Sequence, residues 1–183
     1  LIRFRHQERR EWAPVARIRV LPPQIADQIA AGEVVERPAS VLRELLDNAL
    51  DAEATRIEAE IASGGIELIR ISDDGLGMER DDAVLAFERH ATSKICSSED
   101  LHNILTLGFR GEALAAISAV SRLELVTAPA IGDGTRVVLD QGRLMTAEPA
   151  SRARGTSLSV RDLFGAIPAR RKFLKTPATE LDH

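Results

Sequence analysis

Glu44 and Asn48 lie four residues apart, and their side chains could act together on a bound metal ion and a water molecule. Apolar residues recur at helical spacing through residues 41–50, which predicts a helix there. Residues four apart share one face of a helix. On that face an amide oxygen could bind Mg²⁺ and a carboxylate could activate a water. A solvated outer face would give the same pattern, so both interpretations stay open at this point.

The segment at residues 73–77, Asp-Asp-Gly-Leu-Gly, follows a predicted strand. A carboxylate at a strand end followed by two glycines lets the main chain approach a ligand closely. An ordinary Asp-Gly turn is the alternative. The sequence contains no P-loop motif, and residues 75–80 lack the third glycine of a dinucleotide fingerprint. Those two classes of nucleotide-binding protein are therefore excluded.

Three features further along the chain could contact phosphates or a base. Gly108 and Gly111 precede a predicted helix at residues 112–120, whose first N–H groups could cradle phosphate oxygens. Lys94 could add a positive charge to the same phosphates. Thr156, which opens a late strand, could help to read the edge of a base. Taken singly, each feature also fits a loop or a surface residue.

These residues must be positioned by helices and strands in mixed order. We expect a strand-like piece at residues 18–21 and a first helix at residues 24–31, which Gly32 ends. A hairpin turn is expected at residues 63–65. The other predicted elements are helices from residue 38 and at residues 79–90 and 112–120, and strands at residues 56–61, 67–72, 123–127, 135–139 and 156–160. Such an order predicts an α+β layered sandwich.

Composition narrows the function classes. The 183 residues are 44% hydrophobic but only 3% aromatic, which predicts an aliphatic core and excludes stacking platforms for single-stranded nucleic acid. The net charge of −4 excludes a general polyanion binder, so any DNA contact needs a local basic patch. The single cysteine, Cys96, excludes an intrachain disulfide and favours a cytoplasmic location. Residues 1–17 are expected to be a disordered extension, with a DNA-contacting arm as the alternative.

Taken together and in order, these segments resemble the MutL family of DNA mismatch-repair proteins, within the wider GHKL ATPases. The resemblance covers about residues 18–183, which we expect to form one ATP-binding domain. Residues 21–40 resemble the opening segment of the family. The first to fourth ATP-binding motifs are resembled, in that order, by residues 44–52, 73–77, 108–114 and 155–156. Residues 89–94 resemble the lid of the family, and residues 168–174 are a further family-like stretch.

The resemblance implies a two-layer Bergerat fold, a mixed and mainly antiparallel sheet with helices on one face. It implies that Glu44 is the general base, that Asn48 binds Mg²⁺ and that Asp73 accepts the adenine amino group. Residues implied to contact the nucleotide are Asn48, Ala52, Asp73, Gly77, Met78, Thr92, Ser93, Lys94, Gly108, Phe109, Arg110, Gly111, Glu112, Ala113, Leu114 and Thr156. We also predict a DNA-binding patch, against the alternative of a solvated helix end, at Arg170, Arg171 and Lys172.

For the whole protein, the resemblance implies ATP and Mg²⁺ as cofactors, DNA and a MutS-type mismatch-recognition protein as partners, and ATP-driven lid closure and homodimerisation. Family members continue into a second domain, which supplies a further lysine, and into a dimerisation domain. We therefore expect a weak ATPase and a monomer from this chain alone. The alternatives are a nucleotide-binding module without turnover and another GHKL protein, such as a topoisomerase, an Hsp90-type chaperone or a histidine kinase.

Overall fold

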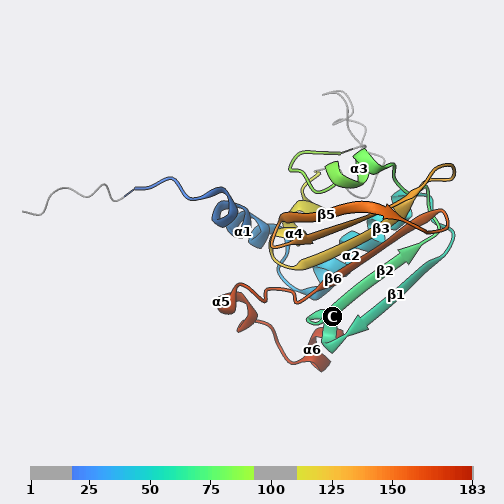
Figure 1. Ribbon diagram of the computed structural model, residues 1–183. Helices are drawn as coiled ribbons and strands as arrows, with labels where there is room; N and C mark the ends of the chain where they lie inside the picture. Colours follow the sequence, from blue (N-terminus) through green and yellow to red (C-terminus); the bar gives the residue numbers. More distant parts are fainter. Residues whose placement is uncertain (1–17, 93–110, 183) are drawn as a thin grey trace, which may run out of the picture.

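The computed structural model describes residues 18–92 and 111–182, which form one antiparallel sheet with helices against one of its faces (Figure 1). The extension predicted at residues 1–17 lies outside this described part. None of the described helices combines the length and the apolar character needed to span a bilayer. The α+β sandwich predicted from the element order is confirmed.

Six strands form the sheet in the order β1-β2-β6-β3-β4-β5, and every neighbouring pair is antiparallel. Their bounds are β1 Ile57–Ala62, β2 Leu68–Asp73, β3 Arg122–Ala128, β4 Gly134–Asp140, β5 Arg143–Ala150 and β6 Gly155–Arg161. The late strand β6 inserts between β2 and β3. This insertion brings the end of β2, the start of β6 and the end of β3 together at one end of the sheet.

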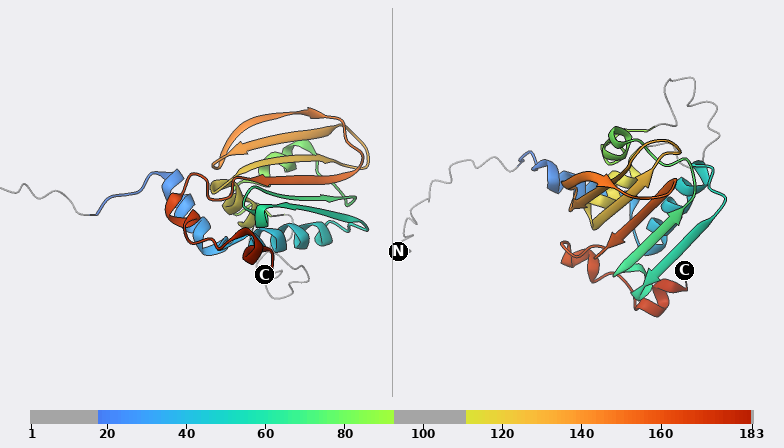
Figure 2. Two further views of the ribbon diagram at one scale, coloured as in Figure 1. Left: turned by 90° about the horizontal axis from the view of Figure 1, so that it is seen from below. Right: turned by 45° about the vertical axis from the view of Figure 1, so that its right-hand side comes forward.

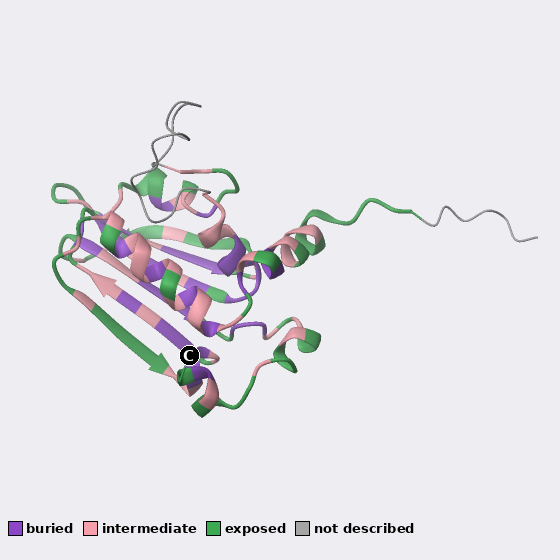
Figure 3. Ribbon diagram, turned by 180° about the vertical axis from the view of Figure 1, so that it is seen from behind, coloured by how far each residue is buried: buried purple, intermediate pink, exposed green. Residues whose placement is uncertain are grey.

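The helices differ greatly in length. They are α1 Pro23–Val34, α2 Pro38–Asp51, α3 Arg80–Leu85, α4 Ala113–Ala119, α5 Pro168–Arg171 and α6 Pro177–Leu181, with one 3₁₀ turn at Ser63–Gly65. The left view of Figure 2 shows α2 running along one face of the sheet, and Figure 3, seen from behind, shows α2 in front of the strands. We call this the inner face. Pro38 fits the first turn of α2, where a missing N–H costs nothing, so the helix begins there.

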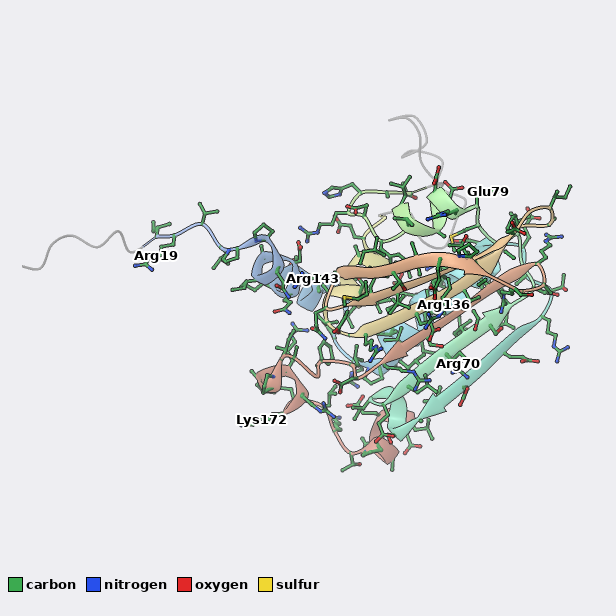
Figure 4. The ribbon with its side chains drawn as sticks, viewed as in Figure 1. Arg19, Arg70, Glu79, Arg136, Arg143 and Lys172 are labelled. Atoms are coloured by element: carbon green, nitrogen blue, oxygen red, sulfur yellow. The ribbon has the colours of Figure 1, made fainter. Side chains whose placement is uncertain are left out.

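The core lies between the inner face of the sheet and the helices on that face, with α2 at its centre and buried residues of α1, α3 and α4 around it. Val41 and Leu45 of α2 pack against Ile69 and Ile71 of β2, and all four side chains are buried. On the outer face, ion pairs join neighbouring strands, as in the pair between Arg70 and Glu60 (Figure 4). In the central strands β2, β6, β3 and β4, most apolar residues therefore face the core and most polar residues face the solvent, whereas the edge strands β1 and β5 have no buried residue.

Four details differ from the elements predicted above. Strand β5 was missed because it is an exposed edge strand that contains Pro149, which weakens a strand signal. Residues 18–21 form no strand and are exposed. Gly32 lies inside α1 rather than ending it. The helix expected at residues 79–90 ends at Leu85, and His90 has a φ of 64°.

Candidate functional site

Helix α2 places Glu44 and Asn48 one turn apart, beside its buried face. Leu45 is 3% exposed, whereas Glu44 and Asn48 are half-buried and border the solvent. Asp47 instead forms an ion pair with the exposed Arg43, at 3.8 Å between nitrogen and oxygen. Glu44 and Asn48 therefore form a pair distinct from the ion pair of Arg43 and Asp47. The helical period alone does not tell these two pairs apart.

The carboxylate of Asp73 lies at the end of β2, where the neighbouring strand β6 begins. Its Oδ1 accepts hydrogen bonds from the N–H of Gly75 at 2.9 Å and of Thr156 at 3.2 Å. Burial raises the pKa of Asp73, and these two hydrogen bonds and the charge of Arg152 oppose that rise. Among the described residues, no hydrogen bond uses Oδ2, so this oxygen is the acceptor that remains for a ligand.

A buried threonine that the sequence analysis missed, Thr127, links three segments behind this carboxylate. Its Oγ1 accepts from the N–H of Met78 at 3.0 Å and lies 2.9 Å from Oγ1 of Thr156 and 3.2 Å from the carbonyl oxygen of Gly155. The sequence signal that could have identified Thr127 is its position in the alternating pattern of β3. In β3 the alternation that buries Leu123 directs Thr127 to the same core face.

Two glycines let the main chain pack tightly here. Gly77 has a φ of 68°, and a Cβ at this position would lie 1.9 Å from the carbonyl oxygen of Ala128. Gly155 has a φ of 119°, and a Cβ there would lie 2.1 Å from the carbonyl oxygen of Asp73. Both the left-handed backbone and the lack of space require glycine at these positions. At Gly77 the close approach that the structure shows is to the end of β3, and the approach to a ligand stays a prediction.

The segment after β2 is also attached to α2. The N–H of Leu76 donates to the carbonyl oxygen of Ala52 at 2.9 Å, just beyond the end of that helix. A Cβ on Gly75 would lie 2.6 Å from the same oxygen. The segment that carries Asp73 is thus joined by main-chain contacts to the helix that carries Asn48, so the two parts of the site are held in one framework.

Two arginines that the sequence analysis did not single out hold the same segment from the other side. Arg152 donates to the carbonyl oxygen of Asp73 at 2.9 Å, and Arg154 donates to that of Gly75 at 2.9 Å. They line an open hollow of about 280 Å³. Asp73 also lines this hollow, but the strands that border it contribute Glu58 and Ser72, whose positions belong to the outer face, so the hollow opens on the face of the sheet opposite to α2.

The predicted phosphate-contacting residues fall partly outside the described part of the chain, namely Ser93, Lys94, Gly108, Phe109 and Arg110. The residues on either side of that gap lie close together. Gly111 has a φ of 61°, and a Cβ there would lie 2.5 Å from the carbonyl oxygen of Ala91. His90 Nδ1 lies 3.2 Å from Glu112 Oε1. Helix α4 begins next, with Ala113 and Leu114 in its first turn, and Thr92 borders the gap on the other side.

The predicted DNA-binding residues have different surroundings. The Arg170 guanidinium donates to the carbonyl oxygens of Gly32, at 2.8 Å, and Val35, at 2.9 Å. A Cβ on Gly32 would lie 2.0 Å from Arg170, which explains a glycine inside α1. Arg171 pairs with Asp162 at 2.8 Å. Lys172 is exposed beside α5, away from the end of β2 that carries Asp73 (Figures 1 and 4).

Glu44 and Asn48 could hold a divalent metal ion only if a bound nucleotide supplied further ligands to that ion. Within residues 18–92 and 111–182, no three His, Cys, Asp or Glu side chains cluster as a metal site. Asn48 and Glu44 offer oxygen atoms from one helical face, the donor type that Mg²⁺ prefers. Mg²⁺ commonly keeps waters and substrate phosphates as most of its ligands, so this donor set fits a metal that arrives with a nucleotide.

Comparison with known proteins points to one family. Residues 36–150 match the family model described as histidine kinase-, DNA gyrase B-, and HSP90-like ATPase. The chain is 60% identical over 170 residues to the DNA mismatch repair protein MutL of Acidobacterium capsulatum, and 59% identical over 168 residues to that of Pasteurella multocida. These matches cover 92% and 91% of this chain but only 26% and 27% of the relatives, so the chain spans about a quarter of their length.

Solved structures give the same result. The fold is similar to the N-terminal domain of a DNA repair protein, with a TM-score of 0.70 and 28% identity, over 85% of this chain and 45% of that one. It is also similar to the Aquifex aeolicus MutL ATPase domain complexed with ADP, with a TM-score of 0.60 and 33% identity, over 80% and 51% of the two chains. The resemblance drawn from the sequence motifs, and the fold that it implied, are confirmed.

Proposed function

The chain belongs to the histidine kinase-, DNA gyrase B-, and HSP90-like ATPase family, and from this premise we propose that it is the ATP-binding and ATP-hydrolysing module of a MutL-type DNA mismatch-repair protein. High identity to MutL proteins supports the repair role. The similar Aquifex aeolicus domain complexed with ADP supports nucleotide binding. The observation that carries the proposal is the Asp73 carboxylate, anchored through Oδ1 beside Thr156 while its Oδ2 remains for a ligand.

Adenine recognition follows from the chemistry of this carboxylate. An ionised Asp73 only accepts hydrogen bonds, so it suits the amino group of adenine. Guanine presents a carbonyl oxygen at the same ring position, and the carboxylate repels it. A hydrogen bond to a charged group contributes about 1.5–3 kcal/mol, which corresponds to roughly a tenfold to hundredfold preference. Oδ1 is held by two main-chain N–H groups, so the carboxylate is already oriented before the base binds.

Hydrolysis is assigned to the polar face of α2. We propose that Glu44 holds and deprotonates the attacking water and that Asn48 ligates the metal one turn away. Mg²⁺, when bound with the nucleotide, supplies charge neutralisation at the phosphates. Phosphoryl transfer depends mainly on positioning and charge stabilisation, so a rigid helix that is buried along its other face is a suitable support.

The remaining parts of the proposal concern the longer protein. We propose that residues 108–114 and Lys94 close over the triphosphate, and that this closure promotes homodimerisation and coupling to DNA and to a MutS-type partner. The contacts between Gly111 and Ala91 and between His90 and Glu112 support it, because they bring together the two ends of the segment that would close. This chain alone is proposed to turn over slowly and to remain a monomer.

Substitution of the general base tests the assignment. Glu44→Ala should keep the ATP affinity of the chain and abolish phosphate release, measured on this chain and on a version extended by the next domain. Asp47→Ala is the matched control, because Asp47 lies on the same helix but pairs with Arg43. Equal loss of binding and turnover in Glu44→Ala would show that Glu44 is a binding residue and not the base.

A further inference from the structure

We infer that Thr127 is a positioning residue for the base of the nucleotide, because its hydroxyl orients the Thr156 hydroxyl and fixes the main chain at Met78. Neither role follows from the sequence motifs, since Thr127 lies outside all of them. The inference rests on the proposed function, because it requires an adenine nucleotide beside Asp73. It adds a second point of base recognition to the carboxylate itself.

The three side chains form a row across three neighbouring strands. Asp73 of β2 is the register partner of Thr156 of β6, and Thr156 is the register partner of Thr127 of β3. Directly paired residues in an antiparallel sheet project from the same face. Thr127 is therefore one strand further from the carboxylate than Thr156, and it can act on the base only through its neighbours.

Burial shows that the hydroxyl of Thr127 has a specific role. The side chain is 0% exposed, and valine would have nearly the same shape in a strand. A buried hydroxyl is costly unless it is hydrogen-bonded, so packing alone favours valine. What the hydroxyl adds is its set of partners: the Met78 N–H, the Gly155 carbonyl and the Thr156 hydroxyl.

Counting protons shows how these partners are coupled. The Thr127 hydroxyl has one hydrogen, and one of its lone pairs is taken by the N–H of Met78. If the hydrogen points to the carbonyl of Gly155, the Thr156 hydroxyl donates to Thr127 and presents only lone pairs to a ligand. If it points to Thr156, the hydrogen of Thr156 is left for a ligand. Thr127 thereby decides whether Thr156 is a donor or an acceptor.

The two states suit different bases. In adenine, the ring nitrogen N1 is an acceptor next to the amino group that Asp73 would bind. The state in which Thr156 donates satisfies N1, directly or through a water. In guanine, N1 carries a hydrogen and its neighbour is a carbonyl oxygen, so the pattern is reversed. Asp73 therefore selects the amino group of adenine, and Thr156 in its donating state would satisfy N1, at a position that Asp73 does not contact.

The contact with Met78 adds a second effect. Its N–H follows Gly77, whose left-handed backbone lies against the carbonyl of Ala128. Thr127 holds the chain at this point, so the backbone from Asp73 to Met78 is fixed at both ends. Loss of the hydroxyl would leave the Met78 N–H without its partner and would loosen the wall of the base site.

The test compares ATP with 1-deaza-ATP, which keeps the amino group but lacks N1. Calorimetry on the intact chain should show that Thr127→Val weakens ATP binding about tenfold, as expected for one lost hydrogen bond. It should weaken 1-deaza-ATP binding clearly less, because the analogue lacks the N1 contact and feels only the loosened main chain at Met78. Thr127→Ser should restore ATP binding. Thr135→Val is the control, because Thr135 is 4% exposed and is the β4 register partner of Thr127.

Several results would overturn the inference. Unchanged ATP affinity in Thr127→Val would do so, and so would an equal loss for ATP and 1-deaza-ATP, which indicates a purely structural role. If Thr127→Val does not fold, Thr127→Cys replaces it, because a thiol is a weak donor of similar size. The affinities of Thr127→Cys for ATP and 1-deaza-ATP are then compared in the same way. If the wild-type chain binds neither nucleotide, the proposed function fails and the inference fails with it.

Discussion

Asp73 and Asp74 are adjacent in the sequence but make separate sets of contacts. Asp73 Oδ1 accepts from the main chain of Gly75 and Thr156. Asp74 accepts from the Thr55 hydroxyl at 2.6 Å and from the N–H groups of Thr55 and Arg56, each at 2.8 Å. The first carboxylate keeps an oxygen for a ligand, and the second anchors the strand end. Substitutions at the two positions should therefore have different consequences.

Asp74→Ala should lower the thermal stability of the chain at neutral pH. Hydrogen bonds from the Thr55 side chain and the Arg56 main chain lower the pKa of Asp74 to about 2. A lowered pKa means that folding favours the ionised form, so the stabilisation is complete above the ordinary aspartate pKa and is lost as the pH falls toward 2. The midpoint difference from wild type should shrink below about pH 4.

Thermal unfolding followed by circular dichroism at several pH values measures this effect. Asp133→Ala, at an exposed loop position, provides the control and should change little at any pH. A stability difference for Asp74→Ala that persists unchanged at pH 2 would contradict the assigned role of this carboxylate.

Removing the Arg152 charge should make ATP binding more sensitive to acid. Burial raises the pKa of Asp73, so the carboxylate loses its charge at a higher pH than an ordinary aspartate as the solution is acidified. Arg152 opposes this rise, and Arg152→Met should shift the loss of ATP affinity to a higher pH. Calorimetric titrations from pH 7.5 downward should show the shift. An identical pH profile for wild type and Arg152→Met would refute the electrostatic coupling.

Gly77→Ala should weaken ATP binding by about tenfold or more and destabilise the fold by more than ~1 kcal/mol. The added Cβ would meet the carbonyl oxygen of Ala128 at 1.9 Å, so the segment after Asp73 must move. Gly132→Ala is a matched control, because Gly132 also has a positive φ, of 120°, but its nearest neighbour is Pro129 at 3.6 Å. If both variants bind ATP equally well, the close packing of Gly77 is not needed for the site.

Substitutions of Lys172 and Arg170 should have different effects, the first on DNA binding and the second on the stability of the fold. Lys172→Glu should weaken binding to double-stranded DNA and reduce the salt slope by about 1 or more, with unchanged thermal stability. Arg170→Ala should instead cost about 1–3 kcal/mol of stability, because the carbonyls of Gly32 and Val35 lose their donors. Arg43→Glu is the charge control on α2. DNA binding that survives charge reversal at both Arg171 and Lys172 would eliminate the patch.

Much of the site could be predicted from local sequence. The apolar stripe of α2 has a helical period, and period alone places Glu44 and Asn48 on one face. The glycines near Asp73 also indicate close packing from sequence alone, because only a residue without a side chain fits a left-handed or crowded backbone. The resemblance of the ordered motifs to one family then favours a nucleotide site over a solvated helix face.

The parts that could not be predicted depend on contacts between distant segments. The insertion of β6 between β2 and β3 brings Thr127 next to Thr156 and Asp73, and no local pattern contains that register. A shared site for Asp73 and Thr156 was expected only through the family resemblance. The pairing of Arg170 with the carbonyl of Gly32 is of the same kind, because the two are separated by 138 positions. There the glycine signal was interpreted as a helix end, although it provides room for a guanidinium.

The central claim is that Asp73 recognises adenine, and calorimetry with ATP and purine riboside triphosphate, which lacks the amino group, tests it most directly. Wild type should prefer ATP by roughly tenfold to a hundredfold. Asp73→Asn should lose that preference and bind ATP as weakly as the analogue, while Asp47→Asn should behave as wild type. A full preference for ATP retained by Asp73→Asn would contradict the account.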